Sequence, residues 1–233
     1  MKYLLSHYSL ILFLTAFLQS CFTTVGFHRK GVLEKINFGK PEILQVCFLT
    51  EEGITDEDIK DLQQAWQEEL KLYNIELKIS GVRRFERLSF WGGGVLGKLP
   101  GLTKVDETCH RYIYLVGRTY GDLAFEVFTL GIFAISGLKF ETYGAVEGYT
   151  QTRGYIKAKY SSLLQLLFTS PESTLVHEGY HLLGCGHQLF LDDCYIKIKR
   201  AKLLRKNVES KSSFLPVITV DEQIILSPED ANY

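Results

Sequence analysis

Runs of apolar and β-branched residues predict a series of short strands. Residues 42–50 (EILQVCFLT) are largely apolar, and residues 75–79 (IELKI) alternate between apolar and polar. Residues 111–116 (RYIYLV) form a third run of this kind. Such runs, rich in β-branched and aromatic residues, are typical of strands. Residues 142–150 and 153–160 have a similar pattern and predict two further strands.

Two other segments have the spacing of amphipathic helices. In residues 55–73, apolar side chains recur at nearly helical intervals after an acidic first turn. Thr55 is a favourable N-cap for this helix, and Asn74 ends the pattern. Residues 171–183 predict a second helix. Ser170 is a favourable N-cap for that helix, and Pro171 is a favourable first helical residue.

The order of these elements indicates an α+β fold with a mixed β-sheet, because strands and helices alternate irregularly. Residues 123–140 are apolar and interrupted by glycines, which predicts either a helix or a buried hairpin. Residues 91–101 are rich in glycine and lack the Gly-Lys-Ser/Thr ending of a phosphate loop, so we expect a flexible surface loop. The main domain is placed at residues 41–233.

Composition and charge narrow the range of partners. Hydrophobic residues make up 46% of the 233 residues and charged residues 23%, which are ordinary values for a globular protein. The formal net charge is −1. Nucleic acid is therefore not expected as a partner, because binding to phosphates requires a basic field.

The amino terminus has the pattern of a secretory signal. Lys2 precedes an apolar stretch that is strongest at residues 10–18, and small residues follow it. This arrangement predicts a signal peptide over residues 1–20. The apolar stretch is shorter and more often interrupted by polar residues than a typical transmembrane helix.

The last residues of the signal resemble a bacterial lipobox. Residues 18–21 read LQSC, with a leucine three positions before Cys21. The resemblance implies cleavage before Cys21, acyl chains such as palmitate on this cysteine, and a membrane anchor in the bacterial cell envelope, in the periplasm or at the cell surface. Residues 21–40 have no clear period and are interpreted as the lipidated cysteine and a tether. A plain signal peptide or an uncleaved anchor is the alternative.

The chain has five cysteines, and lipidation of Cys21 would leave four. Two disulfides could then form in an oxidising compartment, with three possible pairings. Cys185 with Cys194 would close a short loop, and Cys47 with Cys109 would join two predicted strand regions. The sequence does not decide between the pairings, and four buried free thiols are the alternative.

The segment that carries recognisable chemistry runs from His177 to His187. His177 and His181 are four residues apart, so they lie on one face of the predicted helix, one turn apart. Glu178 follows the first histidine. Gly184 can end the helix in a left-handed conformation and allow His187 to turn back toward the other two histidines.

Three neutral histidines that leave one coordination position open are typical of a catalytic zinc site. His177, His181 and His187 are therefore the candidate ligands of one Zn²⁺ ion. Glu178 is the candidate general base, which would take a proton from water while the metal polarises a carbonyl. The alternative is a helix with two core histidines and an ordinary glycine cap.

The pattern HExxHxxGxxH over residues 177–187 resembles the signature of the metzincin zinc endopeptidases. The resemblance implies a metzincin-like fold with a twisted mixed sheet, an upstream helix, an active-site helix and a small C-terminal subdomain. It also implies that residues 142–150 form the strand at the edge of the substrate cleft. A peptide or protein substrate would pair with such an open strand edge.

Two features depart from the metzincin pattern. Metzincins have a methionine turn beneath the zinc, and the only methionine of this chain is Met1. Residues 225–228 (ILSP) resemble this turn, with Leu226 in place of the methionine. Leucine is close to methionine in volume, but a terminal strand and turn is an equal alternative. The chain also ends at Tyr233, which would leave the usual C-terminal helix absent or displaced.

The sequence thus predicts a membrane-anchored zinc endopeptidase in which Glu178 activates water. The alternative is a membrane-tethered, non-catalytic binding protein that retains the metzincin fold, as the missing methionine would allow. A structural lipoprotein without zinc is a third possibility. The intact Glu178 favours the hydrolase, because a site without activity has no physical need for the base.

Overall fold

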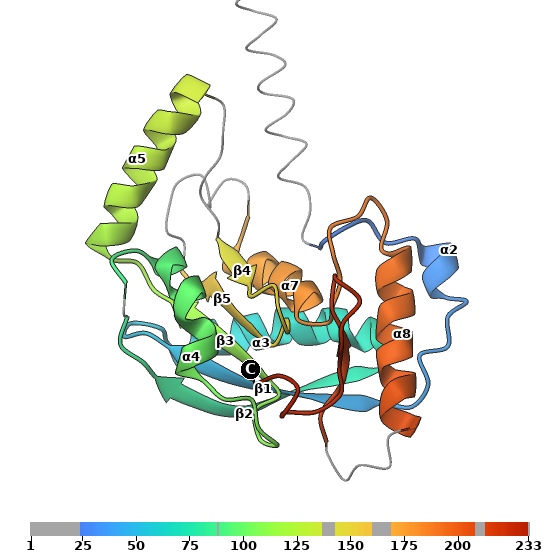
Figure 1. Ribbon diagram of the computed structural model, residues 1–233. Helices are drawn as coiled ribbons and strands as arrows, with labels where there is room; N and C mark the ends of the chain where they lie inside the picture. The colour runs from blue at the N-terminus through green and yellow to red at the C-terminus, as the bar shows by residue number, and fades with distance from the viewer. Residues whose placement is uncertain (1–23, 88, 137–142, 160–168, 208–212, 233) are drawn as a thin grey trace, which may run out of the picture.

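The structure of the protein is a computed structural model (Figure 1). It describes most of the chain after the predicted signal peptide, namely residues 24–87, 89–136, 143–159, 169–207 and 213–232. The predicted signal peptide and Cys21 lie outside the described residues. In the described ranges, no helix is long and apolar enough to cross a membrane.

A mixed five-stranded sheet forms the centre of the molecule. Its strands are β1 (Glu42–Thr50), β2 (Ile75–Arg84), β3 (Arg111–Val116), β4 (Gly144–Val146) and β5 (Arg153–Lys157). The strand order is β2-β1-β3-β5-β4. All neighbours pair in parallel except β4, which pairs antiparallel with β5. The predicted α+β class with a mixed sheet is therefore confirmed.

The fourth strand is shorter than the pattern of residues 142–150 predicted, and residue 142 lies outside the described residues. The strand ends where the Glu147 carboxylate accepts hydrogen bonds from the amides of Thr150 (3.0 Å) and Thr152 (3.0 Å). A carboxylate that binds amides a few residues further on stabilises a turn in place of a ladder. The predicted strand over residues 153–160 likewise ends early, as β5.

Three helices pack on one side of the sheet; in Figure 1 the first two lie behind the strands and the third stands to the right. They are α3 (Asp56–Leu70), α7 (Pro171–His181) and α8 (Asp192–Asn207). Their apolar side chains share one core with the inward residues of β1 and β3. The buried residues of this core include Leu44, Val46, Phe48, Trp66, Ile113, Leu115, Leu175, Tyr180 and Ile198.

Shorter elements cover the opposite face. These are the 3₁₀ helix η2 (Gly92–Lys98), α4 (Leu99–Leu102) and the small sheet of β6 (Val217–Ile218) and β7 (Ile224–Ile225). They form a second core with the alternate residues of β1 and β3. The glycine-rich segment expected to be a flexible loop thus contributes η2 and α4, because Val95 and Leu99 between its glycines are buried.

The helix boundaries follow the predicted caps. The Oγ1 of Thr55 accepts a hydrogen bond from the Asp58 amide at the start of α3. Ser170 accepts one from the Ser173 amide (3.1 Å) at the start of α7. After α3 the chain continues through η1 (Lys71–Tyr73) to Asn74, which is left-handed with φ of 52°. Each cap satisfies a backbone group that the helix leaves unpaired.

Residues 24–40, predicted as part of a tether, pack against the domain. They contain the short helix α2 (Lys30–Leu33), and both Val25 and Phe38 are buried in the first core. The side chain of His28 hydrogen-bonds to Glu69 (2.7 Å) on α3. Single side chains at irregular spacing hold this segment against the domain. The segment therefore has no regular hydrophobic period.

The apolar segment 123–140 was predicted as either a helix or a buried hairpin. Its described part belongs to the helix α5 (Tyr120–Ser136), which projects from the body of the molecule (Figure 1). Val127 and Phe128 are exposed on this helix. The helix alternative is therefore correct, and these apolar side chains are not covered by the domain.

Two disulfides connect the described cysteines. Cys47 on β1 is bonded to Cys109, which lies just before β3. Cys185 is bonded to Cys194 on α8, across nine residues. Of the pairings left open by the sequence, this is the one that joins the two strand regions and closes the short loop.

A single glycine sets how closely α7 approaches α3. A Cβ added to Gly179 would lie 2.2 Å from Nε1 of the buried Trp66, whereas a Cβ added to Gly131 on α5 would meet nothing within 4 Å. We expect Gly179→Ala to lower the free energy of unfolding by about 2 kcal/mol through overpacking. Gly131→Ala should raise it by about 0.5–1 kcal/mol through helix propensity. Urea denaturation measures both, and equal effects would contradict the close contact.

Candidate metal centre

The C-terminal end of α7 fixes the orientation of His181. The helix extends from its Ser170 cap to His181. The Nδ1 of His181 lies 2.7 Å from the backbone oxygen of Cys185. Since a carbonyl only accepts, Nδ1 carries the proton and Nε2 is the nitrogen left with a lone pair for a metal. A hydrogen bond of this kind orients a histidine ligand.

The turn after α7 depends on Gly184, as the sequence predicted. Its φ is +88°, a left-handed value that favours glycine. Its amide donates to the His181 carbonyl (2.9 Å). A Cβ here would lie 1.9 Å from the backbone oxygen of Ile218 on β6. Both the left-handed backbone and the close approach of β6 therefore require a glycine here. The turn directs the chain toward His187.

A buried arginine on β3 holds the other side of this turn. The side chain of Arg111 is completely buried. It donates hydrogen bonds to the backbone oxygens of Leu182 (3.0 Å), His110 (2.9 Å) and Leu215 (2.9 Å). Burial lowers the pKa of Arg111 to about 9, so it remains charged at neutral pH. It thus satisfies a carbonyl at the end of α7 that the helix leaves unpaired.

Between the two helical histidines, Tyr180 points to the opposite side of α7. Its hydroxyl hydrogen-bonds to Tyr73 (2.7 Å) and to Glu69 in the first core. Glu69 also contacts His28 of the N-terminal segment. One face of α7 is therefore fixed by a polar network, which limits rotation of the face that carries His177 and His181.

The three predicted ligands come together. Each of His177, His181 and His187 offers a nitrogen, and these atoms all lie within 4.8 Å of one another. His177 and His181 are half-buried, and His187 is exposed. Three imidazoles converging at the surface could hold one metal ion and leave a position open to solvent.

Glu178 directly follows His177 on α7 and is buried, with 7% of its surface exposed. Burial raises the pKa of Glu178 to about 8. In the described part of the chain, no hydrogen-bond partner reaches its Oε2. A buried carboxylate oxygen without a partner is costly and marks a place where a polar group is expected. The residues therefore fit a metal centre with an acid–base group.

Gly144 on β4 is a site residue that the sequence analysis missed. A Cβ at this position would lie 2.7 Å from Cγ and 3.0 Å from Oε1 of Glu178. The absence of a side chain lets the edge strand lie directly against the Glu178 side chain. One glycine among 20 gives no signal in the sequence, because the contact joins segments 34 positions apart.

The structure also shows where the remaining predicted site residues lie. Leu226 directly follows β7, is half-buried, and donates its amide to Asp230 (3.1 Å) in the next turn. The turn between α7 and His187 is approached by β6 and the residues after it. Ile218 lies close to Gly184, and Val220 lies close to Gly186. The role of Leu226 as a replacement for the turn methionine stays a prediction.

Comparison with known proteins adds no assignment. No protein-family model matches the sequence, and no curated protein matches it.

The histidine cluster predicts a pH dependence of the metal-free protein. Burial, and then the neighbouring His181 and His187, lower the pKa of His177 from 6.5 to about 4. The unfolded chain therefore binds more protons than the folded chain between these values. This contribution to stability is present above pH 6.5 and is lost as the pH falls toward 4.

We expect the unfolding temperature of the metal-free protein to fall across this window, and to fall less steeply in His177→Gln. Thermal unfolding in a chelator at several pH values measures both slopes. Parallel curves for the two proteins would contradict a lowered pKa of His177.

Proposed function

We propose that this protein is a zinc-dependent endopeptidase of metzincin type, exported and anchored in the cell envelope by lipid on Cys21. The observation that carries the proposal is the convergence of the His177, His181 and His187 nitrogens beside the buried carboxylate of Glu178. Two disulfides among the described residues support an exported protein, because disulfides persist in oxidising compartments.

The donor set favours zinc over other common metals. Three imidazoles at one site suit Zn²⁺, whereas Mg²⁺ and Ca²⁺ prefer oxygen ligands. His177, His181 and His187 would hold the ion. Bound zinc supplies a Lewis acid for a peptide carbonyl and lowers the pKa of water.

Glu178 supplies the proton transfer. Its Oε2 has no hydrogen-bond partner within the described residues, so the oxygen is available to a water molecule at the centre. A dication nearby lowers the pKa of a carboxyl that burial alone raises, so Glu178 would be ionised as a base. After bond cleavage the same oxygen can return the proton to the leaving amine.

The edge strand β4 is suited to position a peptide. It is the last strand of the sheet and pairs on one side with β5. An extended peptide can add to an open strand edge through backbone hydrogen bonds. Gly144 on this strand lies against Glu178, so a peptide aligned on β4 would pass close to the catalytic carboxylate.

The first test separates metal binding from catalysis. His181→Ala should lose the metal, because a ligand is removed. Glu178→Gln should keep about one zinc per chain and lose at least about 100-fold in turnover, the usual contribution of a general base. Metal analysis by mass spectrometry and a peptide-library cleavage assay measure the two properties.

Three results would contradict the proposal in different ways. A folded wild-type protein without zinc would exclude the metal centre. Zinc without cleavage of any peptide would favour the non-catalytic binding protein. Equal cleavage by the wild type and Glu178→Gln would exclude Glu178 as the base.

The second test concerns the contact between β4 and the base. Gly144→Ala should lower turnover by about tenfold or more, because the added methyl group displaces the Glu178 side chain, and small displacements of catalytic groups are costly. Gly148→Ala is the matched control, since a Cβ there meets nothing within 4 Å. The zinc content of both variants should equal that of the wild type. Unchanged turnover in Gly144→Ala would contradict the proposed placement of Glu178.

A further inference from the structure

The helix α5 projects from the domain and exposes apolar side chains. Val127 is 65% exposed and Phe128 is 63% exposed, with Leu123 also exposed nearer to the domain. Tyr120, the first residue of the helix, is 93% exposed. Exposed apolar side chains this large, next to one another on a projecting element, indicate a surface that contacts an apolar partner.

The acidic residues of α5 lie only in its first half, and both are paired with cations. The Asp122 carboxylate forms an ion pair with Arg87. Glu126 lies 3.6 Å from Arg118 and 4.0 Å from Lys157. From residue 127 to its end, α5 contains no ionisable residue. The projecting half of the helix can therefore enter an apolar phase without carrying a charge.

The length and ends of the helix match insertion into one leaflet. Ten residues from 127 to 136 span about 15 Å, which is half of the hydrocarbon thickness of a bilayer. The base of the helix carries Tyr120 and the half-exposed Arg118. Aromatic and basic side chains are typical of the headgroup region at the end of an inserted segment.

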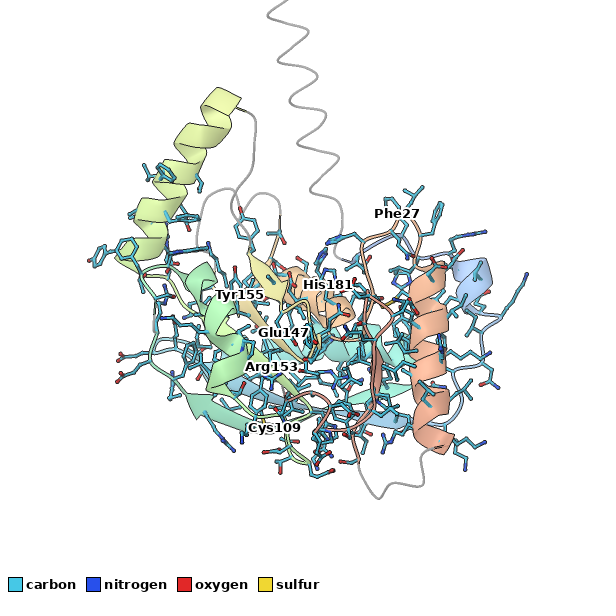
Figure 2. All side chains as sticks on the ribbon, in the orientation of Figure 1. Phe27, Cys109, Glu147, Arg153, Tyr155 and His181 are labelled. Atoms are coloured by element: carbon cyan, nitrogen blue, oxygen red, sulfur yellow. A yellow bond between two sulfur atoms is a disulfide. The ribbon has the colours of Figure 1, made fainter. Side chains whose placement is uncertain are left out.

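The same side of the molecule holds the start of the described chain. Figure 2 shows Phe27 on the side toward which α5 projects, with His181 deeper between them. Phe27 is 45% exposed and pairs with Phe190, which is also exposed next to Leu189. The predicted lipid on Cys21 is six residues before Phe27 in the sequence, which is a short reach from this side of the domain.

We infer that α5 is a membrane-inserting arm that, with the N-terminal anchor, holds the histidine face of the domain against a lipid bilayer. The occupant is lipid because Phe27, close in sequence to the predicted Cys21 anchor, lies on the side toward which the uncharged half of α5 projects. A consequence, which rests on the proposed function, is that the substrate is a polypeptide segment at the bilayer surface and not a freely diffusing protein.

The test measures how deep α5 lies in the membrane, independently of zinc. The full chain carrying Val127→Cys, labelled with an environment-sensitive fluorophore, is reconstituted in phosphatidylethanolamine–phosphatidylglycerol vesicles. Val82→Cys is the matched control, because Val82 is an exposed valine (48%) on β2, outside this face. We expect lipids brominated in the acyl chain to quench the probe at position 127 severalfold more strongly than at position 82, with or without a chelator.

Every other result overturns the inference. A protein that does not float with the vesicles, or a position-127 probe that is unquenched, would place α5 in water. Equal quenching at both positions would show non-specific adsorption. A position-127 probe already shielded without vesicles, with cross-links between copies, would identify a second copy of the chain as the partner. Since the result does not require metal, failure of the zinc proposal leaves it interpretable.

Discussion

The Arg111 guanidinium connects three segments through hydrogen bonds to their backbone oxygens. It is the buried charge around which β3, the end of α7 and the chain leading to β6 are arranged. Each donor that points to a carbonyl fixes a backbone position, because a buried guanidinium is stable only when its hydrogen bonds are satisfied. The backbone at Leu182, where the turn toward His187 begins, is thus held in place. His187 itself is exposed.

The two faces of the helix α7 have different surroundings. One face carries His177 and His181 toward solvent, and the other packs Tyr180 into the first core. The adjacent Gly179 lets α7 approach α3 closely, since any side chain would meet Trp66. The positions of the candidate metal ligands on α7 are therefore set mainly by packing on the side of the helix that faces away from them.

Local features of the fold and the site could be predicted from the sequence. The caps at Thr55 and Ser170, the left-handed Gly184 and the convergence of three histidines depend on residues a few positions apart. The contact of Gly144 with Glu178, the role of Arg111 and the packing of residues 24–40 depend on segments far apart in the chain. Each of these contacts depends on single residues that do not recur at a regular spacing. The sequence therefore has no pattern from which they could be predicted.

Cys185 and Cys194 are nine positions apart, and the disulfide between them closes a loop that contains His187. Closing this loop removes most of the conformational freedom that His187 has in the reduced chain. Oxidation therefore meets part of the entropic cost of bringing His187 to the other two histidines. A metal held by the three histidines would be bound less tightly in the reduced chain, although no ligand is changed.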